Sequence, residues 1–224
     1  MSETSNLAQV EHRPSTPWMV GCIRTGGSAL PHPMTARDIA ADARFATGMF
    51  ALMGIGAGST VLFTCASSEY AQFWPFEQAL ETLGACVAVA DNSPFDAGRS
   101  EMFMRRLSVD LAFGIGSEIV DGMAMMKLDV ATAFSPAKLI CARTAAADRL
   151  ATLGFSPWRM VAFGPAFAFI APDGTTYHDQ DEWLFEAPAG ELLITARQAR
   201  GNQLKRFATG VRGGLDSAGA LRFD

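Results

Sequence analysis

The sequence is poor in the features that mark nucleic-acid-binding, membrane-spanning and secreted proteins. Only three of its 224 residues are lysine and its net charge is −5, which argues against a general nucleic-acid-binding surface. No apolar run reaches the ~18 residues that a membrane-spanning helix needs. The polar first residues, which include Glu3, are unlike a signal peptide. We therefore expect a cytoplasmic protein with no nucleic-acid and no membrane partner.

The sequence is equally poor in metal-binding and nucleophilic motifs. Its four cysteines are scattered and include no Cys-x-x-Cys pair. A structural zinc site needs closely spaced thiolates, so we predict no metal site. There is no Gly-x-Ser-x-Gly elbow and no Cys/His pair at catalytic spacing, and we name no catalytic residue. His178 lies in the polar stretch 177–182, which is more typical of a solvated hairpin loop than of a metal or acid–base cluster.

What the chain does have is enough apolar material for a core, with 49% hydrophobic and 18% charged residues. Up to residue 164, short apolar runs without alternation are separated by stretches of helical periodicity. The expected strands are 18–23, 61–66, 86–90, 111–114, 139–142 and 159–163, and the expected helices are 39–53, 71–83, 98–107, 117–126 and 145–153. Thr35 and Asp38 predict a capping box before the first helix, and Gly84 a helix end. This order is typical of an α/β fold with a doubly wound, mostly parallel sheet and helices on both faces.

After residue 164 the helical periodicity disappears. Short strands separated by glycine-rich turns predict a smaller antiparallel, barrel-like β subdomain. The expected strands are 167–170, 183–186, 191–196, 203–208 and 220–223. We therefore divide the chain into a loose N-terminal arm (1–17), an α/β subdomain (18–164) and an antiparallel β subdomain (165–224).

Several short motifs follow one another along the chain. They are Arg24-Thr-Gly-Gly-Ser-Ala-Leu-Pro31, Thr35-Ala-Arg-Asp38, Met53-Gly-Ile-Gly-Ala-Gly-Ser59, Leu83-Gly-Ala85, Phe163-Gly-Pro-Ala-Phe167, Gly190-Glu-Leu-Leu-Ile-Thr195, Leu204-Lys-Arg-Phe-Ala-Thr-Gly-Val211 and Leu215-Asp-Ser-Ala-Gly-Ala-Leu221. Their order resembles the adenylate-forming superfamily of acyl- and aryl-CoA ligases, in particular its phenylacetate-CoA ligase-like branch. The resemblance extends over roughly residues 20–223 and rests on the order of the motifs, because no single motif is specific.

The departures from that family pattern concern the contacts that the family makes with ATP. The phosphate loop is short, and Ala29 or Leu30 stands where the family has a lysine. The segment 163–167 has no carboxylate for magnesium, and Val211 replaces the aspartate that binds the ribose hydroxyls. The chain also ends at Asp224, before the small lobe that supplies the family's adenylation lysine. The resemblance therefore implies a truncated and degenerate member whose ATP binding is very weak.

Two groups of candidate binding residues follow from this resemblance. Thr25, Gly26, Gly27 and Ser28 are interpreted as the remnant of a phosphate loop, with a plain turn and a working phosphate site as the alternatives. A ligand pocket is predicted at Phe163, Gly164, Pro165, Ala166 and Thr209.

The preferred hypothesis for function is a non-catalytic or strongly degenerate homologue of acyl/aryl-CoA ligases without a cofactor. It would bind a small carboxylate or an acyl thioester such as an acyl-CoA, or assist a partner protein. One alternative is a split or minimal ligase that uses ATP and Mg²⁺ and is completed by a separate protein. The other is an interaction scaffold without a small-molecule ligand. A homodimer is expected, with Met49, Phe50 and Met53, or Phe73, Trp74 and Phe76, near its interface.

Overall fold

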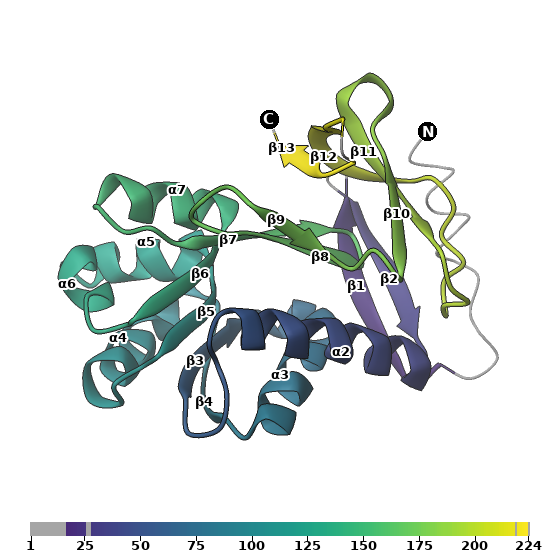
Figure 1. Cartoon of the computed structure of the whole chain (residues 1–224). Coiled ribbons are helices and arrows are strands. Elements are labelled where there is room, and N and C mark those ends of the chain that lie inside the picture. The colour runs from purple at the N-terminus through teal and green to yellow at the C-terminus, as the bar shows by residue number, and fades with distance from the viewer. Residues whose placement is uncertain (1–16, 26–27, 218, 224) are drawn as a thin grey trace. The chain divides into compact units, whose positions relative to one another are not determined.

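The computed structural model describes residues 17–25, 28–217 and 219–223, and for Ser28 the backbone only. It contains two compact units (Figure 1). The first comprises the chain up to Asp42 together with Ala162–Ala168 and Thr176–Asp224, and the second comprises Ala43–Val161 and Phe169–Thr175. These units are not continuous in sequence, and the subdomain boundary expected at residue 164 stays a prediction. No helix in the described part of the chain is long and apolar enough to cross a membrane.

The predicted α/β fold is confirmed. A seven-stranded sheet has the order β4-β3-β5-β6-β7-β8-β9, and the pairs β3–β4, β3–β5, β5–β6 and β6–β7 are parallel. The strands are β3 (Thr60–Cys65), β4 (Cys86–Asp91), β5 (Leu111–Ile115), β6 (Leu139–Arg143), β7 (Trp158–Phe163), β8 (Ala166–Ile170) and β9 (Thr176–His178). Only two residues separate β7 from β8, a connection short enough to join antiparallel strands but not parallel ones.

The strands of the second unit are buried on both faces. Because neighbouring side chains of a strand point to opposite sides, the contacts of two consecutive residues show what covers each face. Leu62 and Ala112 belong to an apolar cluster with α4 (Ala97–Arg106), α5 (Ser117–Met125), α6 (Val130–Phe134) and α7 (Thr144–Thr152). Their neighbours Phe63 and Phe113 stack on each other and meet aromatic rings of α2 (Ala36–Leu52) and α3 (Tyr70–Leu83). Helices therefore cover both faces of these strands, as the unbroken apolar runs predicted.

The helix signals are also confirmed. The backbone N–H of Thr35 donates to Asp38 Oδ2 (2.8 Å) and the N–H of Asp38 to Thr35 Oγ1 (3.3 Å), which is the predicted capping box. Gly84 ends α3 with φ +72°. The short helix α6 was not predicted, because five residues are too few to show a helical period; Asp129 caps it by accepting from the N–H of Thr132.

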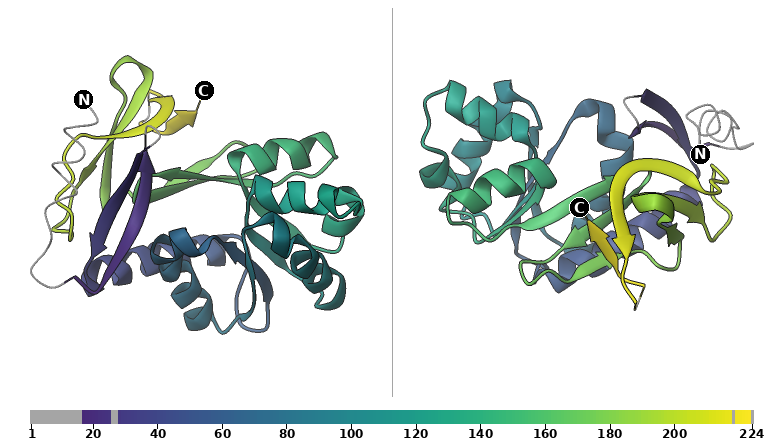
Figure 2. Two further views of the ribbon diagram at one scale, coloured as in Figure 1. Left: turned by 180° about the vertical axis from the view of Figure 1, so that it is seen from behind. Right: turned by 90° about the horizontal axis from the view of Figure 1, so that it is seen from above.

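The remaining strands form antiparallel sheets in the first unit, which confirms the prediction for the strands after residue 183. Two expected strands were assigned to the wrong sheet: the strand at 18–23 belongs to a separate antiparallel hairpin, and the strand at 167–170 is β8 of the seven-stranded sheet. One antiparallel sheet has the order β10-β11-β12-β13, and its strands are β10 (Trp183–Glu186), β11 (Glu191–Ala196), β12 (Phe207–Leu215) and β13 (Leu221–Phe223). Figure 2 shows β12 as a strongly curved strand. The expectation of a strand at 203–208 was wrong in its bounds, since β12 begins at Phe207.

The other antiparallel sheet is a hairpin of β1 (Met19–Thr25) and β2 (Ser28–Met34). We did not predict β2, because Pro31 and Pro33 argue against a strand. Prolines two residues apart place both missing N–H groups on the same side of the strand, however, and an edge strand tolerates that. The predicted N-terminal arm lies, except for Pro17, outside the described residues.

Candidate functional site

All residues predicted to bind a ligand belong to the first unit. Thr25, the last residue of β1, is buried, and its hydroxyl donates a hydrogen bond of 2.8 Å to the carbonyl oxygen of Ala208 on β12. The structure thus brings the phosphate-loop motif beside the Thr-Gly-Val motif, although the two are more than 180 residues apart in sequence. The hydroxyl proton of Thr25 is used within the fold and is not available to a phosphate.

The predicted phosphate loop begins at the last residue of β1 and ends at the first residue of β2. Thr25 pairs with Ser28, so that only Gly26 and Gly27, which lie outside the described residues, separate the two strands. Two residues bring at most two further backbone N–H groups. A phosphate site of the glycine-rich type uses a row of such donors, and the interpretation of Thr25 to Ser28 as the remnant of one stays a prediction.

Thr209 on β12 is also buried, and its hydroxyl already makes two hydrogen bonds within the chain. Its hydroxyl donates to the carbonyl oxygen of Leu192 (2.7 Å) and accepts from the N–H of Val211 (3.1 Å). Val211 itself brings an isopropyl group, which cannot accept a hydrogen bond. This part of β12 therefore offers no side-chain acceptor to a ribose.

The segment from Phe163 to Ala166 is packed with apolar groups. The ring of Phe163 lies 5.5 Å from that of Phe223 and 5.2 Å from that of Phe185, between ring centroids. Gly164 has φ +63°, and a Cβ there would lie 3.1 Å from the ring of Phe207. Pro165 and Ala166 are buried as well. The structure brings Phe163 and Gly164 beside the strands of the antiparallel sheet, and the ligand pocket proposed there stays a prediction.

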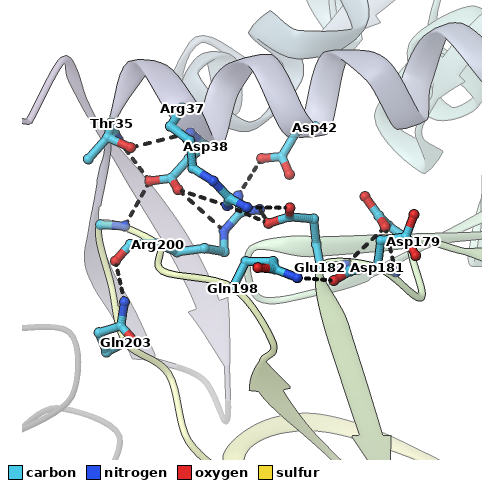
Figure 3. Close-up of polar contacts among 11 residues, drawn as sticks. Thr35, Arg37, Asp38, Asp42, Asp179, Asp181, Glu182, Gln198, Arg200 and Gln203 are labelled. Carbon is cyan, nitrogen blue, oxygen red and sulfur yellow. Dashed lines mark hydrogen bonds and ion pairs between the residues drawn. The ribbon is translucent and has the colours of Figure 1, made fainter.

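The structure also contains a buried ionic cluster that we did not predict (Figure 3). It consists of Asp38, Asp42, Glu182 and Arg200, which are buried or mostly buried, and of Arg37, whose side chain is 44% exposed. Arg37 makes two hydrogen bonds of 2.7 Å to the carboxylate of Glu182, and Arg200 bonds the same carboxylate at 2.9 Å. Arg200 also binds Asp42 at 2.7 Å, while Asp38 accepts from two backbone N–H groups. The side chains of Arg200 and Glu182 are both 1% exposed, so these charges have left water almost completely.

The ionic cluster joins three segments that are distant in sequence. Arg37, Asp38 and Asp42 lie on the first turns of α2, Glu182 precedes β10, and Arg200 lies in the segment before β12. The guanidinium of Arg200 also lies 4.6 Å from the centre of the Trp183 ring, a cation–π contact. Each carboxylate of the cluster accepts a hydrogen bond from an arginine or from the backbone, while Asp38 Oδ1 is buried without a hydrogen-bond partner among the described residues. The cluster therefore joins distant segments of the first unit. Among the described residues there is no group of histidine, cysteine and acidic side chains that could hold a metal ion.

Burial displaces the pKa values of groups in and beside this cluster. Burial raises the pKa of Asp42 to about 6, against the opposing charge of Arg200. His32 contacts Asn202 at 2.9 Å, and burial, reinforced by the charge of Arg200, lowers its pKa to about 3. Burial also acts to raise the pKa of Glu182, but the hydrogen bonds and charges of Arg37 and Arg200 outweigh it and hold that pKa below its usual value.

We expect His32 and Asp42 to give folding opposite pH dependences. Unfolded His32 gains its proton near pH 6.5 and folded His32 only near 3, so its contribution to stability is lost as the pH falls below 6.5. Asp42 holds its proton up to about pH 6 when folded but only to 3.8 when unfolded, so its contribution is lost as the pH rises through 6. The shifts correspond to free energies on the order of 5 kcal/mol for His32 and 3 kcal/mol for Asp42, and their pH dependences oppose each other between pH 4 and 6.

Removing one of the two groups should reveal how the other makes the stability of the fold depend on pH. His32→Gln should lose stability as the pH rises from 4 to 6, and Asp42→Asn should lose stability as the pH falls over the same range. Urea unfolding of the wild type and both variants at several pH values measures this. Parallel stability curves for the three proteins would contradict the interpretation.

His178 is not in a solvated loop. It is the last residue of β9, half-buried, and its ring meets that of Phe185 edge-on at 4.9 Å between centroids. Burial, together with the charge of Arg197, lowers its pKa. Its position in an apolar contact is that of a structural histidine.

The comparisons with known proteins are clear for the fold. No protein-family model and no curated protein sequence matches this chain. Among solved structures, 2-hydroxyisobutyryl-CoA ligase in the postadenylation state with 2-HIB-AMP superposes with a TM-score of 0.72 at 18% identity, over 100% of this chain and 56% of that one. The chain has the fold of the adenylate-forming acyl-CoA ligases.

Two further ligases support this statement. A malonyl-CoA ligase with methylmalonyl-CoA and AMP bound matches with a TM-score of 0.59 at 15% identity, over 93% of this chain and 52% of that one. The Escherichia coli enzyme MenE, bound to an analogue of OSB-AMS, gives 0.58 at 14%, over 93% and 48%. The chain thus spans about half the length of the ligases that it resembles. At this level of identity the likeness establishes the fold alone.

Proposed function

We propose that this chain is a non-adenylating homologue of the acyl-CoA ligases that keeps their fold and binds a small carboxylate or an acyl thioester, or assists a partner protein. The observation that carries the proposal is the state of the two threonines. The hydroxyls of Thr25 and Thr209, in the two motifs that the family uses for ATP, are both buried and bonded to main-chain carbonyl groups.

Three further features support the loss of nucleotide binding. The connection after Thr25 is two residues long. The segment from Phe163 to Phe167 brings apolar groups where the family has a carboxylate for magnesium. Val211 cannot bind a ribose hydroxyl. A lost hydrogen bond to a ligand costs about 1–3 kcal/mol when its partner stays buried, so losing several contacts together should lower ATP affinity by several orders of magnitude.

A small carboxylate or acyl thioester is the ligand class that the structural neighbours suggest. Their bound molecules are acyl adenylates, CoA, and methylmalonyl-CoA with AMP. A chain that keeps the fold but not the ATP contacts would retain the ability to hold the acyl part of such molecules.

We expect no pyrophosphate release when the purified chain is incubated with MgATP, CoA and a panel of short aliphatic and aromatic acids. In the same panel, without ATP, at least one acid or acyl-CoA should raise the midpoint of thermal unfolding. An active acyl-CoA ligase assayed in parallel is the control for the reagents. Pyrophosphate release that depends on one acid would contradict the proposal and favour a ligase. A panel without any stabilising ligand would argue against the ligand-binding part.

A further inference from the structure

Strand β4 is an unprotected edge of the seven-stranded sheet (Figure 1). Proteins commonly protect sheet edges by short strands, prolines, lysines or bulges. At the opposite edge, β9 has only three residues. β4 has six residues, contains neither proline nor lysine, and keeps a continuous register with β3 from Cys86 to Asp91.

The backbone hydrogen bonds of β4 show which of its groups face outwards. The N–H of Cys86 donates to Ser59 O (2.8 Å), and the N–H of Asn92 donates to Cys65 O (3.1 Å). Because successive residues of a strand direct their N–H and C=O groups to opposite sides, residues 86, 88 and 90 bond to β3. Residues 87, 89 and 91 therefore direct their backbone groups away from the sheet.

Both ends of this outer edge are closed by contacts within the chain. At one end the N–H of Ala85 donates to Leu80 O (3.0 Å), and at the other the N–H of Asp91 donates to Asp96 Oδ2 (2.7 Å). Between them, the N–H groups of Val87 and Val89 face outwards without a hydrogen-bond partner among the residues that the structure describes. The side chain of Val89 is also 48% exposed. The free part of the edge is therefore two residues that point the same way.

We propose that two copies of this chain pair antiparallel through β4, with the two-fold axis at Ala88. In this register Val87 of each copy lies opposite Val89 of the other. These are hydrogen-bonded pairs, so each pair exchanges two N–H···O=C bonds. The pairing uses all the free donors of both edges and leaves none over.

The surroundings of the edge favour this register over its neighbours. A shift by two residues would pair Val87 with Asp91 or Val89 with Ala85, and such a pair could form one hydrogen bond in place of two because the N–H groups of Ala85 and Asp91 are already taken. Asp91 is the only charged residue of β4, and in the proposed register it lies opposite Ala85 of the second copy, so that no like charges face each other. Phe95, 87% exposed just beyond the end of β4, adds apolar surface at each end of the pair. This dimer is independent of the function proposed above.

The first test separates backbone pairing from side-chain contact at Val89. Val89→Pro removes an outward-facing N–H but no hydrogen bond to β3, and edge strands tolerate proline at such positions. Val89→Ala keeps the N–H and removes only methyl groups. In light scattering over a range of micromolar concentrations, the wild type should reach twice its monomer mass of 23.9 kDa. Dimer formation should weaken at least tenfold in Val89→Pro and less than that in Val89→Ala.

The second test fixes the register and does not depend on proline. Ala88 and its copy form a non-hydrogen-bonded pair with Cα atoms about 4.5 Å apart, which lies within the range of a disulfide. Ala88→Cys, made with Cys22→Ser and Cys86→Ser, should form a covalent dimer on mild oxidation. The matched control keeps native Cys86, which lies opposite Ala90 of the second copy, and should stay uncrosslinked. A monomer mass for the wild type at all concentrations, equal weakening by both Val89 variants, or cross-linking through Cys86 in place of Ala88→Cys would overturn the proposal.

Discussion

Replacing Arg200 with alanine should lower the free energy of unfolding by about 3–5 kcal/mol, the cost of leaving buried charges without their partner. Arg200 is the side chain that bonds both Glu182 and Asp42, and all three have lost most of their contact with water. The variant would also lose the contact of the guanidinium with the Trp183 ring. Denaturant unfolding at neutral pH measures the effect.

Two other substitutions serve as controls for Arg200→Ala. Arg200→Lys keeps the charge but not the planar fork that reaches two carboxylates at once, so its loss should be intermediate. Arg105→Ala breaks an exposed pair with Glu101 within one helix and should leave stability unchanged within error. Equal stability of the Arg200→Ala and Arg105→Ala proteins would contradict the role assigned to the buried ionic cluster.

Gly114→Ala should destabilise the second unit severely, by more than about 4 kcal/mol, because it combines backbone strain with a steric clash. Gly114 in β5 has φ +81°, and a Cβ there would lie 2.2 Å from the carbonyl oxygen of Thr64 in β3. The register between β5 and β6 also shifts at this residue. An alanine could be accommodated only by separating β3 from β5 at the centre of the sheet.

Gly58→Ala is the matched control for Gly114→Ala. Gly58 has nearly the same dihedral angle, φ +82°, but no atom lies within 4 Å of the position of its Cβ. Its substitution should therefore cost only the backbone strain, about 1–2 kcal/mol. The difference between the two unfolding free energies isolates the clash. Similar losses in both variants would show that β3 and β5 do not approach as closely as the structure indicates.

The parts of the fold that the sequence predicted are those set by local patterns. The capping box of Thr35 and Asp38 and the left-handed end at Gly84 depend on a few neighbouring residues, and both are present. The apolar runs of β3 and β5 showed a sheet covered on both faces. Strand β2 was not predicted because a proline normally argues against a strand. Pro31 and Pro33 are acceptable only because β2 is an edge strand.

The parts that could not be predicted depend on contacts between distant segments. Arg200 lies in the polar stretch Gln198-Ala-Arg-Gly-Asn-Gln203, whose composition is typical of a solvated loop. Its partners are Asp42, 158 residues away, and Glu182, 18 residues away. Nothing in the local sequence distinguishes this buried arginine from a surface one. The same holds for the free donors of β4, which become visible only when the register with β3 is known.

The residues near which we expected a dimer interface lie in or beside the core of the second unit. Met49, Phe50, Met53, Phe73 and Phe76 are buried, and Trp74 is half-buried. The position of an interface near them stays a prediction. The exposed apolar side chains lie elsewhere, at Phe95 and Met125 among others.

The central claim is that the fold of an acyl-CoA ligase is present here without its ATP site, and the binding of MgATP tests it most directly. Thermal unfolding of the purified chain should be followed with MgATP, MgGTP and magnesium alone at equal ionic strength. Since a ligand that binds only the folded chain stabilises it by RT ln(1 + [L]/Kd), millimolar ATP reports any affinity in the micromolar range. We predict the same midpoint in all three solutions. A rise of several degrees with MgATP alone, saturating at micromolar concentration, would contradict the account.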